Sequence, residues 1–319
     1  MRVAVVGAGA IGGFIAGALA RSGIDVSVVA RGAHLTAIIR DGLRVRSQLG
    51  DFSVSIPAAA DIRDLGGFDW ILVAIKAHQW AAVLPQLAPY AGTPATIVPM
   101  QNGLPFWYFP DRSLDSVDPG GLLRRTFADA QLVGAVVHAS GDIPQPGVVH
   151  QLGGKLYPIG ELDGRRSERV AFLAAMFENA GLEAPIQTNI RREVWRKLLG
   201  NVSLNPVSAL TRATIGPMLE DPDGRALIRA IMQETIATAK AAGCDPEIDA
   251  EERIVFASRL AGVKTSMLQD LEARRPLELD PIVGAVVELA CELGVDAPRT
   301  SAVYALTKLL DAVVRTNPT

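Results

Sequence analysis

The chain opens with a short apolar run that ends in three glycines spaced as GxGxxG. Residues 3–6 (Val-Ala-Val-Val) are typical of a buried parallel strand, and a helical stretch follows at once and runs to about Ser22. The turn between them consists of Gly7, Ala8, Gly9, Ala10, Ile11 and Gly12. Glycine permits the tight bend, a close ligand approach and close packing of the helix on the strand. Free N–H groups at the helix start would face an anion, so the turn predicts a bound dinucleotide pyrophosphate.

Arg31 follows a second expected strand, over residues 25–30, at the place where such folds contact the adenosine ribose. A carboxylate there would accept a hydrogen bond from the 2′-hydroxyl, whereas a guanidinium binds a 2′-phosphate through charge-assisted bonds. One such bond contributes about 1.5–3 kcal/mol, which is roughly a tenfold to hundredfold preference between cofactors. Arg31 therefore predicts NADP(H).

Residues 3–20 carry no charge, lie between two arginines and end in Ala-Leu-Ala, which also fits a signal peptide or a membrane anchor. Five of these 18 residues are glycine. Secretory and membrane-spanning segments instead consist mainly of leucine and other strong helix formers. We therefore expect no membrane association from this segment.

Composition narrows the class of protein. The 319 residues suffice for two domains, and 49% hydrophobic with 20% charged residues are ordinary for a soluble globular enzyme. A net charge of −3 with four histidines offers no basic surface, so we expect no nucleic-acid partner. Cys244 and Cys291 lie far apart in sequence, which argues against a disulfide framework and fits a reducing cytoplasm. No metal-ligand spacing occurs, and we expect no metal.

Apolar strand runs alternate with helical stretches over the first half of the chain, as in β-α-β units. Buried strands of a mostly parallel sheet are expected at residues 43–54, 70–75, 95–99 and 132–137, and an antiparallel edge hairpin at 147–160. From Asn189 only helical periods appear, near 189–209, 217–242, 247–262, 280–294 and 298–315. The prediction is an α/β chain with an N-terminal Rossmann-type dinucleotide-binding domain, residues 1–188, and a C-terminal all-helical domain, residues 189–319.

Two polar residues follow the ends of expected strands. Lys76 comes after residues 70–75, and Asn102 comes after 95–99 in a Gln-Asn-Gly sequence. Both would face the cofactor cleft, where Lys76 could reach the phosphates or a ribose and Asn102 the nicotinamide ribose or amide. A solvated lysine and a turn-forming Asn-Gly pair are the alternatives.

Lys197, Asn201 and Asn205 recur at i, i+4 and i+8 and therefore share one helix face. The segment beyond Leu198 is mostly apolar, which predicts burial, and buried amides need partners that leucine and valine cannot supply. A polar ligand would supply them. Alternatively, the asparagines bind neighbouring backbone groups and Lys197 is a surface residue. Ser266 and Glu278 could likewise be a helix cap and a surface acid.

Together these motifs resemble the ketopantoate reductases, and the resemblance runs from Met1 to the last helix. Its specific parts are the glycine turn with Arg31, the segments 75–79 (IKAHQ) and 101–103 (QNG), and the segments 192–211 (REVWRKLLGNVSLNPVSALT) and 265–280 (TSMLQDLEARRPLELD). The resemblance implies NADPH-dependent reduction of the 2-ketone of 2-dehydropantoate (ketopantoate) to pantoate, in cytoplasmic pantothenate and coenzyme A synthesis.

The family's roles transfer residue by residue. The resemblance implies that Lys197 contacts the substrate as general acid, and that Glu278 and Lys76 lie against the cofactor and the reacting centre. It further implies that Asn102 bridges cofactor and substrate. Substrate carboxylate and hydroxyl ligands would be Asn201, Asn205 and Ser266. The chemistry agrees, because an ammonium can stabilise and protonate the oxygen that hydride addition makes negative, and a carboxylate such as Glu278 would keep it charged.

The sequence departs from the family pattern at the aromatic run Phe106–Phe109 and at Ile215, where some members place a polar substrate ligand. We expect the aromatic run to serve packing rather than a widened pocket. The loop 110–122 has no usable periodicity. His138 and Ser140 follow an expected strand end, where a structural histidine is the preferred interpretation over a place in the cleft.

The leading hypothesis is thus a reductase of a small 2-keto acid. One alternative is a paralogous enzyme that reduces another 2-keto acid. An alternative of a different class is an NADP(H)-sensing regulatory protein without turnover, which Lys197 and Glu278 disfavour because sensing needs no proton donor. The apolar helix faces allow packing within the chain or a homodimer.

Overall fold

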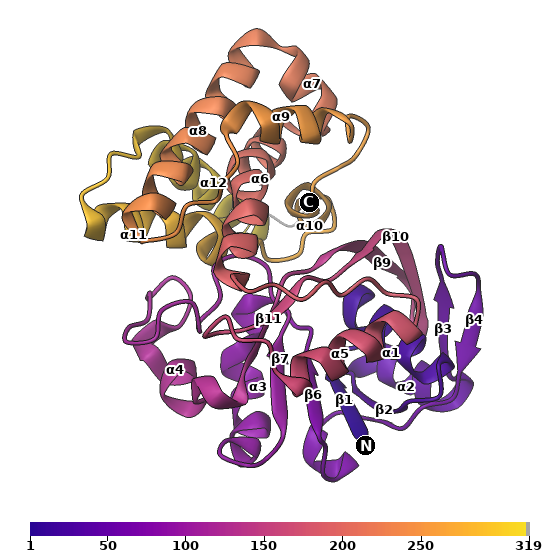
Figure 1. Ribbon diagram of the computed structural model, residues 1–319. Helices are drawn as coiled ribbons and strands as arrows, with labels where there is room; N and C mark the ends of the chain where they lie inside the picture. The colour runs from indigo at the N-terminus through magenta and orange to yellow at the C-terminus, as the bar shows by residue number, and fades with distance from the viewer. Residues whose placement is uncertain (317–319) are drawn as a thin grey trace. The chain divides into compact units, whose positions relative to one another are not determined.

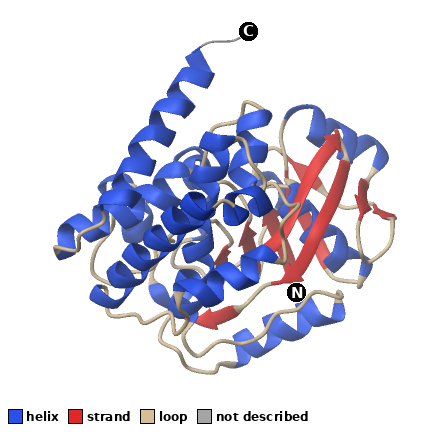
Figure 2. Cartoon of the chain, turned by 90° about the horizontal axis from the view of Figure 1, so that it is seen from above, coloured by secondary structure: helices blue, strands red, loops and turns tan. Residues whose placement is uncertain are grey.

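The computed structural model describes residues 1–316, and the chain forms two compact units (Figure 1). The first unit contains residues 1–101 and 123–190, and the second contains residues 102–122 and those from 191 onward. Within the described residues all strands belong to the first unit, while the second is built from helices and loops (Figure 2). Residues 102–122 therefore pack with the helices, although they lie in sequence between two segments of the first unit.

A parallel five-stranded sheet organises the first unit, in the order β5-β2-β1-β6-β7. The strands are β1 (Arg2–Val6), β2 (Asp25–Val29), β5 (Ala58–Ala59), β6 (Trp70–Val73) and β7 (Thr96–Pro99). The chain passes from β1 to β2 on one side, and β6 joins β1 on the other. The carboxyl end of β1 is therefore the switch point at which open α/β sheets bind ligands.

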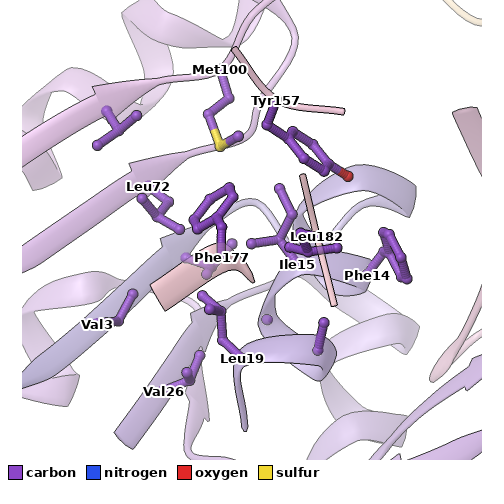
Figure 3. Packing of buried hydrophobic residues seen from close by; sticks show 14 of the residues in the cluster. Val3, Phe14, Ile15, Leu19, Val26, Leu72, Met100, Tyr157, Phe177 and Leu182 are labelled. Carbon is purple, nitrogen blue, oxygen red and sulfur yellow. The ribbon is translucent and has the colours of Figure 1, made fainter. Parts of the chain in front are cut away.

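Apolar side chains on one face of this sheet form a large core cluster of the first unit (Figure 3). Val3 and Leu72 lie on neighbouring strands, and Phe14 and Leu19 pack from α1 (Ala10–Arg21). Phe177 packs from α5 (Glu168–Asn179). The other helices of this unit are α2 (Gly32–Asp41), α3 (Trp80–Leu87) and α4 (Leu122–Thr126). Burial of strand residues on both faces explains the unbroken apolar runs of the sequence.

Two segments expected in the parallel sheet lie outside it. Residues 43–54 form β3 (Leu43–Arg46) and β4 (Phe52–Val54), which pair antiparallel in a second sheet. β3 alternates buried and exposed residues, as a strand covered on one face does. The other segment, 132–137, forms β8 (Val133–Ala135), which pairs antiparallel with β11 (Ile159–Glu161). A single β-bridge between Leu132 and Ile97 links this segment to β7.

The hairpin expected over residues 147–160 is longer and begins earlier. It consists of β9 (His138–Gln145) and β10 (Val148–Leu156), and β10 also pairs with β3, so the second sheet has the order β4-β3-β10-β9. β10 is therefore an inner strand rather than an edge strand. His138 and Ser140 lie within β9, which begins at His138, three residues after the end of β8.

The second unit contains seven α-helices and a π-helical turn within the described residues, and its elements differ from expectation in three places. These elements are α6 (Ile190–Thr211), α7 (Ile215–Glu220), α8 (Pro222–Ala241), α9 (Ala250–Ser258), α10 (Ser266–Glu272), η6 (Asp280–Gly284), α11 (Ala285–Leu293) and α12 (Pro298–Thr316). One difference is the helix over residues 266–272, which no expected stretch covers. The stretch 217–242 is two helices because Asp221 caps α8 and Pro222 occupies its first position. The stretch 280–294 begins with η6, the π-helical turn.

The aromatic run lies inside the second unit. Phe106, Trp107 and Tyr108 are buried, and Trp195 of α6 donates a hydrogen bond to the Tyr108 hydroxyl at 2.5 Å. The loop after it is held by Glu288 of α11, whose carboxylate accepts hydrogen bonds from two backbone N–H groups at residues 115 and 116. The run thus serves packing within this unit. No helix among residues 1–316 has the length and apolar character needed to cross a membrane.

Candidate active site

The glycine turn has the backbone geometry that its sequence predicts. Gly7 has a φ of +98°, and a Cβ there would lie 2.7 Å from the Ala74 carbonyl oxygen. A Cβ on Gly12 would collide with the Gly7 carbonyl, so only glycine lets α1 lie this close to β1. Gly9 differs, because a Cβ there would meet no atom within 4 Å. Its open side is the space that a ligand would occupy.

That open side suits a pyrophosphate. Gly9 is the N-cap residue of α1 and has no side chain that could accept hydrogen bonds from the first N–H groups of the helix. The first turn of α1 contains no acidic residue. The first N–H groups of a helix have no partner inside the helix, and together with the helix dipole they attract an anion. The turn therefore fits a dinucleotide at the switch point of the sheet.

His34 supports this turn and is a residue that sequence reasoning missed. Its Nε2 donates to the Ala8 carbonyl at 2.8 Å, and its Nδ1 accepts from the Gly147 N–H at 3.0 Å. Because the amide donates to Nδ1, the imidazole is neutral with its proton on Nε2. Burial also lowers the pKa of His34. A histidine near the start of a helix carries no sequence signal for this role.

Arg31 and Lys76 occupy the strand ends that the sequence predicts. Arg31 is exposed at the start of α2, and its side chain makes no hydrogen bond or ion pair with another residue in 1–316. Lys76 is half-buried and begins the short 3₁₀ turn η2 (Ala77–Gln79). It follows Ala74 and Ile75, the two residues on which Gly7 packs. Lys76 therefore leaves the sheet beside the glycine turn.

Lys197, Asn102 and Glu278 meet within the second unit. The Asn102 Oδ1 accepts a hydrogen bond from the Lys197 ammonium, and its Nδ2 donates to Glu278 Oε2 at 3.3 Å. An ammonium can only donate and a carboxylate can only accept, so the orientation of the amide is determined by its two neighbours. Glu278 is 8% exposed, which excludes the alternative of a surface acid.

A close backbone contact holds Asn102 in this position. Gly103 has a φ of +85°, and a Cβ there would lie 2.6 Å from the Pro281 carbonyl carbon. The Leu104 N–H donates to the Pro281 carbonyl at 2.8 Å. Pro281 belongs to η6, which begins two residues after Glu278. The Asn-Gly pair is therefore more than a turn, because it places the amide against the segment that carries Glu278.

The protein around Lys197 changes its acidity. Desolvation lowers the pKa of Lys197 to about 8, while the negative charge of Glu278 raises it and partly offsets that effect. An amine with this pKa is largely protonated at neutral pH and gives up its proton far more readily than a surface lysine. This is the behaviour expected of a general acid.

The remaining predicted ligands have different surroundings. Asn205 is 5% exposed, and its Nδ2 has no hydrogen-bond partner among the described residues. Asn201 is half-buried one turn before it on the same face of α6. Ser266 is exposed and makes no hydrogen bond to Lys197, Asn102 or Glu278 within residues 1–316. It is not the cap of α10, because Thr265 accepts the capping hydrogen bond.

Ile215 is buried and apolar at the start of α7. No group of three or more His, Cys, Asp or Glu side chains in residues 1–316 could hold a metal ion.

Two family models and a relative of similar sequence match most of the chain. The family model described as ketopantoate reductase PanE/ApbA matches residues 3–164, and that of its C-terminal part matches residues 189–311. The 2-dehydropantoate 2-reductase of Mesorhizobium japonicum is 41% identical over 318 residues, which cover 97% of this chain and 98% of that protein.

Solved structures share the whole fold. A protein of Ralstonia solanacearum assigned to the ketopantoate reductases superposes with a TM-score of 0.92 at 36% identity, covering 99% of each chain. D-mandelate dehydrogenase, solved with NADH and anilino(oxo)acetate, has a TM-score of 0.87 at 18% identity and covers 98% of this chain and 99% of its own. The latter likeness concerns the fold alone.

A Rossmann-type first unit, a helical second unit and a half-buried lysine beside an amide and a carboxylate define a dinucleotide-dependent oxidoreductase. The chain belongs to the ketopantoate reductase family. This family comprises nicotinamide-dinucleotide-dependent oxidoreductases that act on a CH–OH group.

Proposed function

We propose that the protein reduces 2-dehydropantoate to pantoate with NADPH and that Lys197 is the proton donor. The observation that carries the proposal is the Lys197–Asn102–Glu278 set, in which the lysine has a pKa of about 8. The name of the Mesorhizobium japonicum relative supports the choice of substrate. A protein that only senses NADP(H) would have no use for this proton donor.

The side chains divide the work of the reaction. A bound nicotinamide cofactor supplies the hydride. The Lys197 ammonium hydrogen-bonds to the ketone oxygen, stabilises its growing negative charge and transfers a proton to it. Asn102 holds the ammonium by accepting one of its hydrogen bonds, and Glu278 holds Asn102 in turn. Loss of such a general acid costs roughly 10²–10⁴ in rate.

The cofactor would be bound by the first unit, which corresponds to the predicted domain 1–188 without residues 102–122. The turn Gly7–Gly12 would hold the pyrophosphate, and Lys76 would add positive charge beside it. The exposed Arg31 guanidinium, which has no hydrogen-bond or ion-pair partner in residues 1–316, would bind the 2′-phosphate that distinguishes NADPH from NADH. Glu278 and Asn102 would also contact the cofactor.

The substrate would be bound by the helical domain, from about residue 189 onward. The unpartnered Asn205 amide needs an acceptor, and a substrate hydroxyl or carboxylate would supply it. Asn201 and Ser266 would provide further hydrogen bonds. Each such bond lost to an analogue without the acceptor leaves a buried polar group unpaired, which is the basis of strong selectivity.

We further propose that the protein acts in cytoplasmic pantothenate and coenzyme A synthesis. Cys244 is buried and Cys291 exposed, and both are free thiols, as a reducing compartment favours. A homodimer also stays a prediction. Leu306, Leu309 and Val313 are exposed on α12 at helical spacing, and sedimentation velocity would test whether they pair two chains.

Steady-state assays test the function directly. NADPH oxidation is followed with ketopantoate and with other 2-keto acids, including pyruvate, 2-oxoisovalerate and benzoylformate, and each assay is repeated with NADH. The proposal requires the highest kcat/KM for ketopantoate with NADPH. A higher value for another acid would assign the chain to a paralogous reductase, and no turnover with any acid would favour a sensor.

A further inference from the structure

Arg253 has a largely buried guanidinium that makes no hydrogen bond or ion pair with another residue in 1–316. It lies on α9, and its Nη1 is buried without a hydrogen-bond partner among the described residues. Its side chain likewise makes no ion pair within residues 1–316. The ring of Phe256, one turn further along α9, lies 5.1 Å from its Cζ and covers one face of the guanidinium. Burial lowers the pKa of Arg253, and no carboxylate offsets that effect.

The guanidinium lies directly against α6 at Gly200. A Cβ on Gly200 would collide with Nη2 and would lie 2.9 Å from Cζ. Glycine inside a helix costs about 1 kcal/mol relative to alanine, so the long helix α6 gives up stability where it admits this guanidinium. Gly200 is three residues after Lys197 and directly precedes Asn201. Residues three apart are neighbours on a helix surface, so Arg253 borders the face that carries Lys197.

The acids closest in sequence to Arg253 are engaged elsewhere. Glu251 pairs with Arg229 and Arg225 of α8. Asp249 and Glu252 form the capping box at the start of α9, where each side chain accepts a backbone N–H of the other. A buried cation without a counter-charge is strongly unfavourable, and an oxygen acceptor from outside the chain would relieve that cost.

We propose that Arg253 is a further substrate-binding and specificity-determining residue, which binds an oxygen at the end of the 2-keto acid remote from the reacting ketone. This inference rests on the proposed reductase function. Lys197 and Asn102 bind the ketone in this proposal. Gly200 lies one turn further along α6, so the guanidinium beside it contacts the distal part of the substrate. In ketopantoate that group is the 4-hydroxyl, and in a dicarboxylic 2-keto acid it is the second carboxylate.

Two substrates that differ by a single oxygen provide the test. Ketopantoate carries the 4-hydroxyl, and 3,3-dimethyl-2-oxobutanoate is the same acid without it; 2-oxoglutarate carries a distal carboxylate. We expect the unaltered enzyme to have a kcat/KM for one of the oxygen-bearing acids that is roughly tenfold to hundredfold higher than for 3,3-dimethyl-2-oxobutanoate. This is the range of one charge-assisted hydrogen bond. Arg253→Met should reduce that preference at least tenfold, mainly through KM, and Arg253→Lys should restore part of it.

Arg229→Met is the matched control, since Arg229 is an arginine on the neighbouring helix with an exposed ion pair to Glu251. It should leave the preference unchanged. Thermal melts of all variants confirm folding, and calorimetric titration of pantoate and its 4-deoxy analogue into the NADP⁺-bound protein measures the same preference without turnover. Retained preference in Arg253→Met, by either measurement, would overturn the assignment while leaving the reductase function intact. Absence of both turnover and binding in the unaltered protein would overturn both proposals.

Discussion

At the scale of single residues, the chemistry of this protein depends on what surrounds the amine of Lys197. Burial by itself lowers the pKa of this amine, and full exposure would leave it near 10.5. The combination of desolvation with the charge of Glu278 leaves it at about 8. In the proposed reaction the lysine would thus be charged when a ketone binds and acidic enough to protonate the product.

The pH dependence of the reaction follows from this value. Reduction needs the protonated amine, so kcat/KM should be nearly constant below pH 8 and should fall about tenfold per pH unit above it. Oxidation of the hydroxy acid needs the neutral amine, and its rate should rise over the same interval. Stopped assays in both directions from pH 6 to 10 measure the two profiles.

Lys197→Met is the control for that assignment. It should lower kcat roughly 10²–10⁴-fold and remove the inflection near pH 8. If the inflection persists in the variant, another group titrates and Lys197 is not the acid.

Arg31 is predicted to determine the choice of cofactor. Arg31→Ala removes the guanidinium that would bind the 2′-phosphate, so the KM for NADPH should rise roughly tenfold to hundredfold while that for NADH changes little. Arg63→Ala is a suitable comparison, because Arg63 is an exposed arginine of the same unit that pairs with Asp61. Equal effects on both cofactors would show that Arg31 does not read the phosphate.

At the scale of elements, three segments that are distant in sequence converge on one amide. α6 presents Lys197, the segment before η6 presents Glu278, and the loop after β7 presents Asn102. The loop docks through Gly103, whose positive φ and contact with Pro281 leave no room for a side chain. Short π-helical turns are often found at functional sites, and η6 has that position here.

Gly103→Ala should therefore damage the site as well as the fold. The added methyl collides with Pro281 and displaces Asn102, and a displacement of about 1 Å near a reacting group can cost roughly a hundredfold in rate. We expect kcat to fall by about tenfold to a hundredfold together with a lower melting temperature. Both quantities are measured on the same preparation.

Gly243→Ala is the control that separates the effect of the collision with Pro281 from the effect of placing alanine at a positive φ. Gly243 has a φ of +82°, close to that of Gly103, but a Cβ there meets nothing within 4 Å. The substitution should cost about 1–2 kcal/mol of stability with unchanged kcat. Similar losses of kcat in both variants would mean that general destabilisation, and not the position of Asn102, limits the rate.

At the scale of the whole molecule, the two functions belong to separate compact units. The glycine turn and Arg31 lie in the first unit, and Lys197, Asn102, Glu278 and Arg253 lie in the second. Each unit has its own buried core, so we expect the phosphate contacts of the cofactor and the proton donor to be held by separate frameworks.

That separation predicts additive effects on cofactor binding. Lys197→Met should leave the Kd for NADPH nearly unchanged, Arg31→Ala should raise it, and the double variant should match Arg31→Ala within a factor of about two, the usual limit for independent sites. Fluorescence titration of NADPH gives all four constants. A larger coupling would place the two residues in one cooperative network.

Much of the first unit could be predicted because its signals are local. Apolar runs and glycines determine β1, the turn and α1, since strand burial, positive φ and close packing each require particular residue types over a few positions. The change at Asn189 from alternating strands and helices to helical periods only is likewise a local signal. The prediction that residues 43–54 and 132–137 belong to the parallel sheet is wrong, because a short apolar strand carries no local sign of the sheet that it joins.

The sequence by itself determined which groups are present to bind ligands: a glycine turn suited to a pyrophosphate, an arginine suited to a phosphate, and a lysine with two asparagines on one helix face. Only the tertiary structure decided that Asn102 lies between Lys197 and Glu278, that His34 supports the turn and that Arg253 packs on Gly200. The reason is physical. Periodicity describes neighbours along the chain, whereas desolvation and hydrogen bonds between distant segments exist only after the chain has folded.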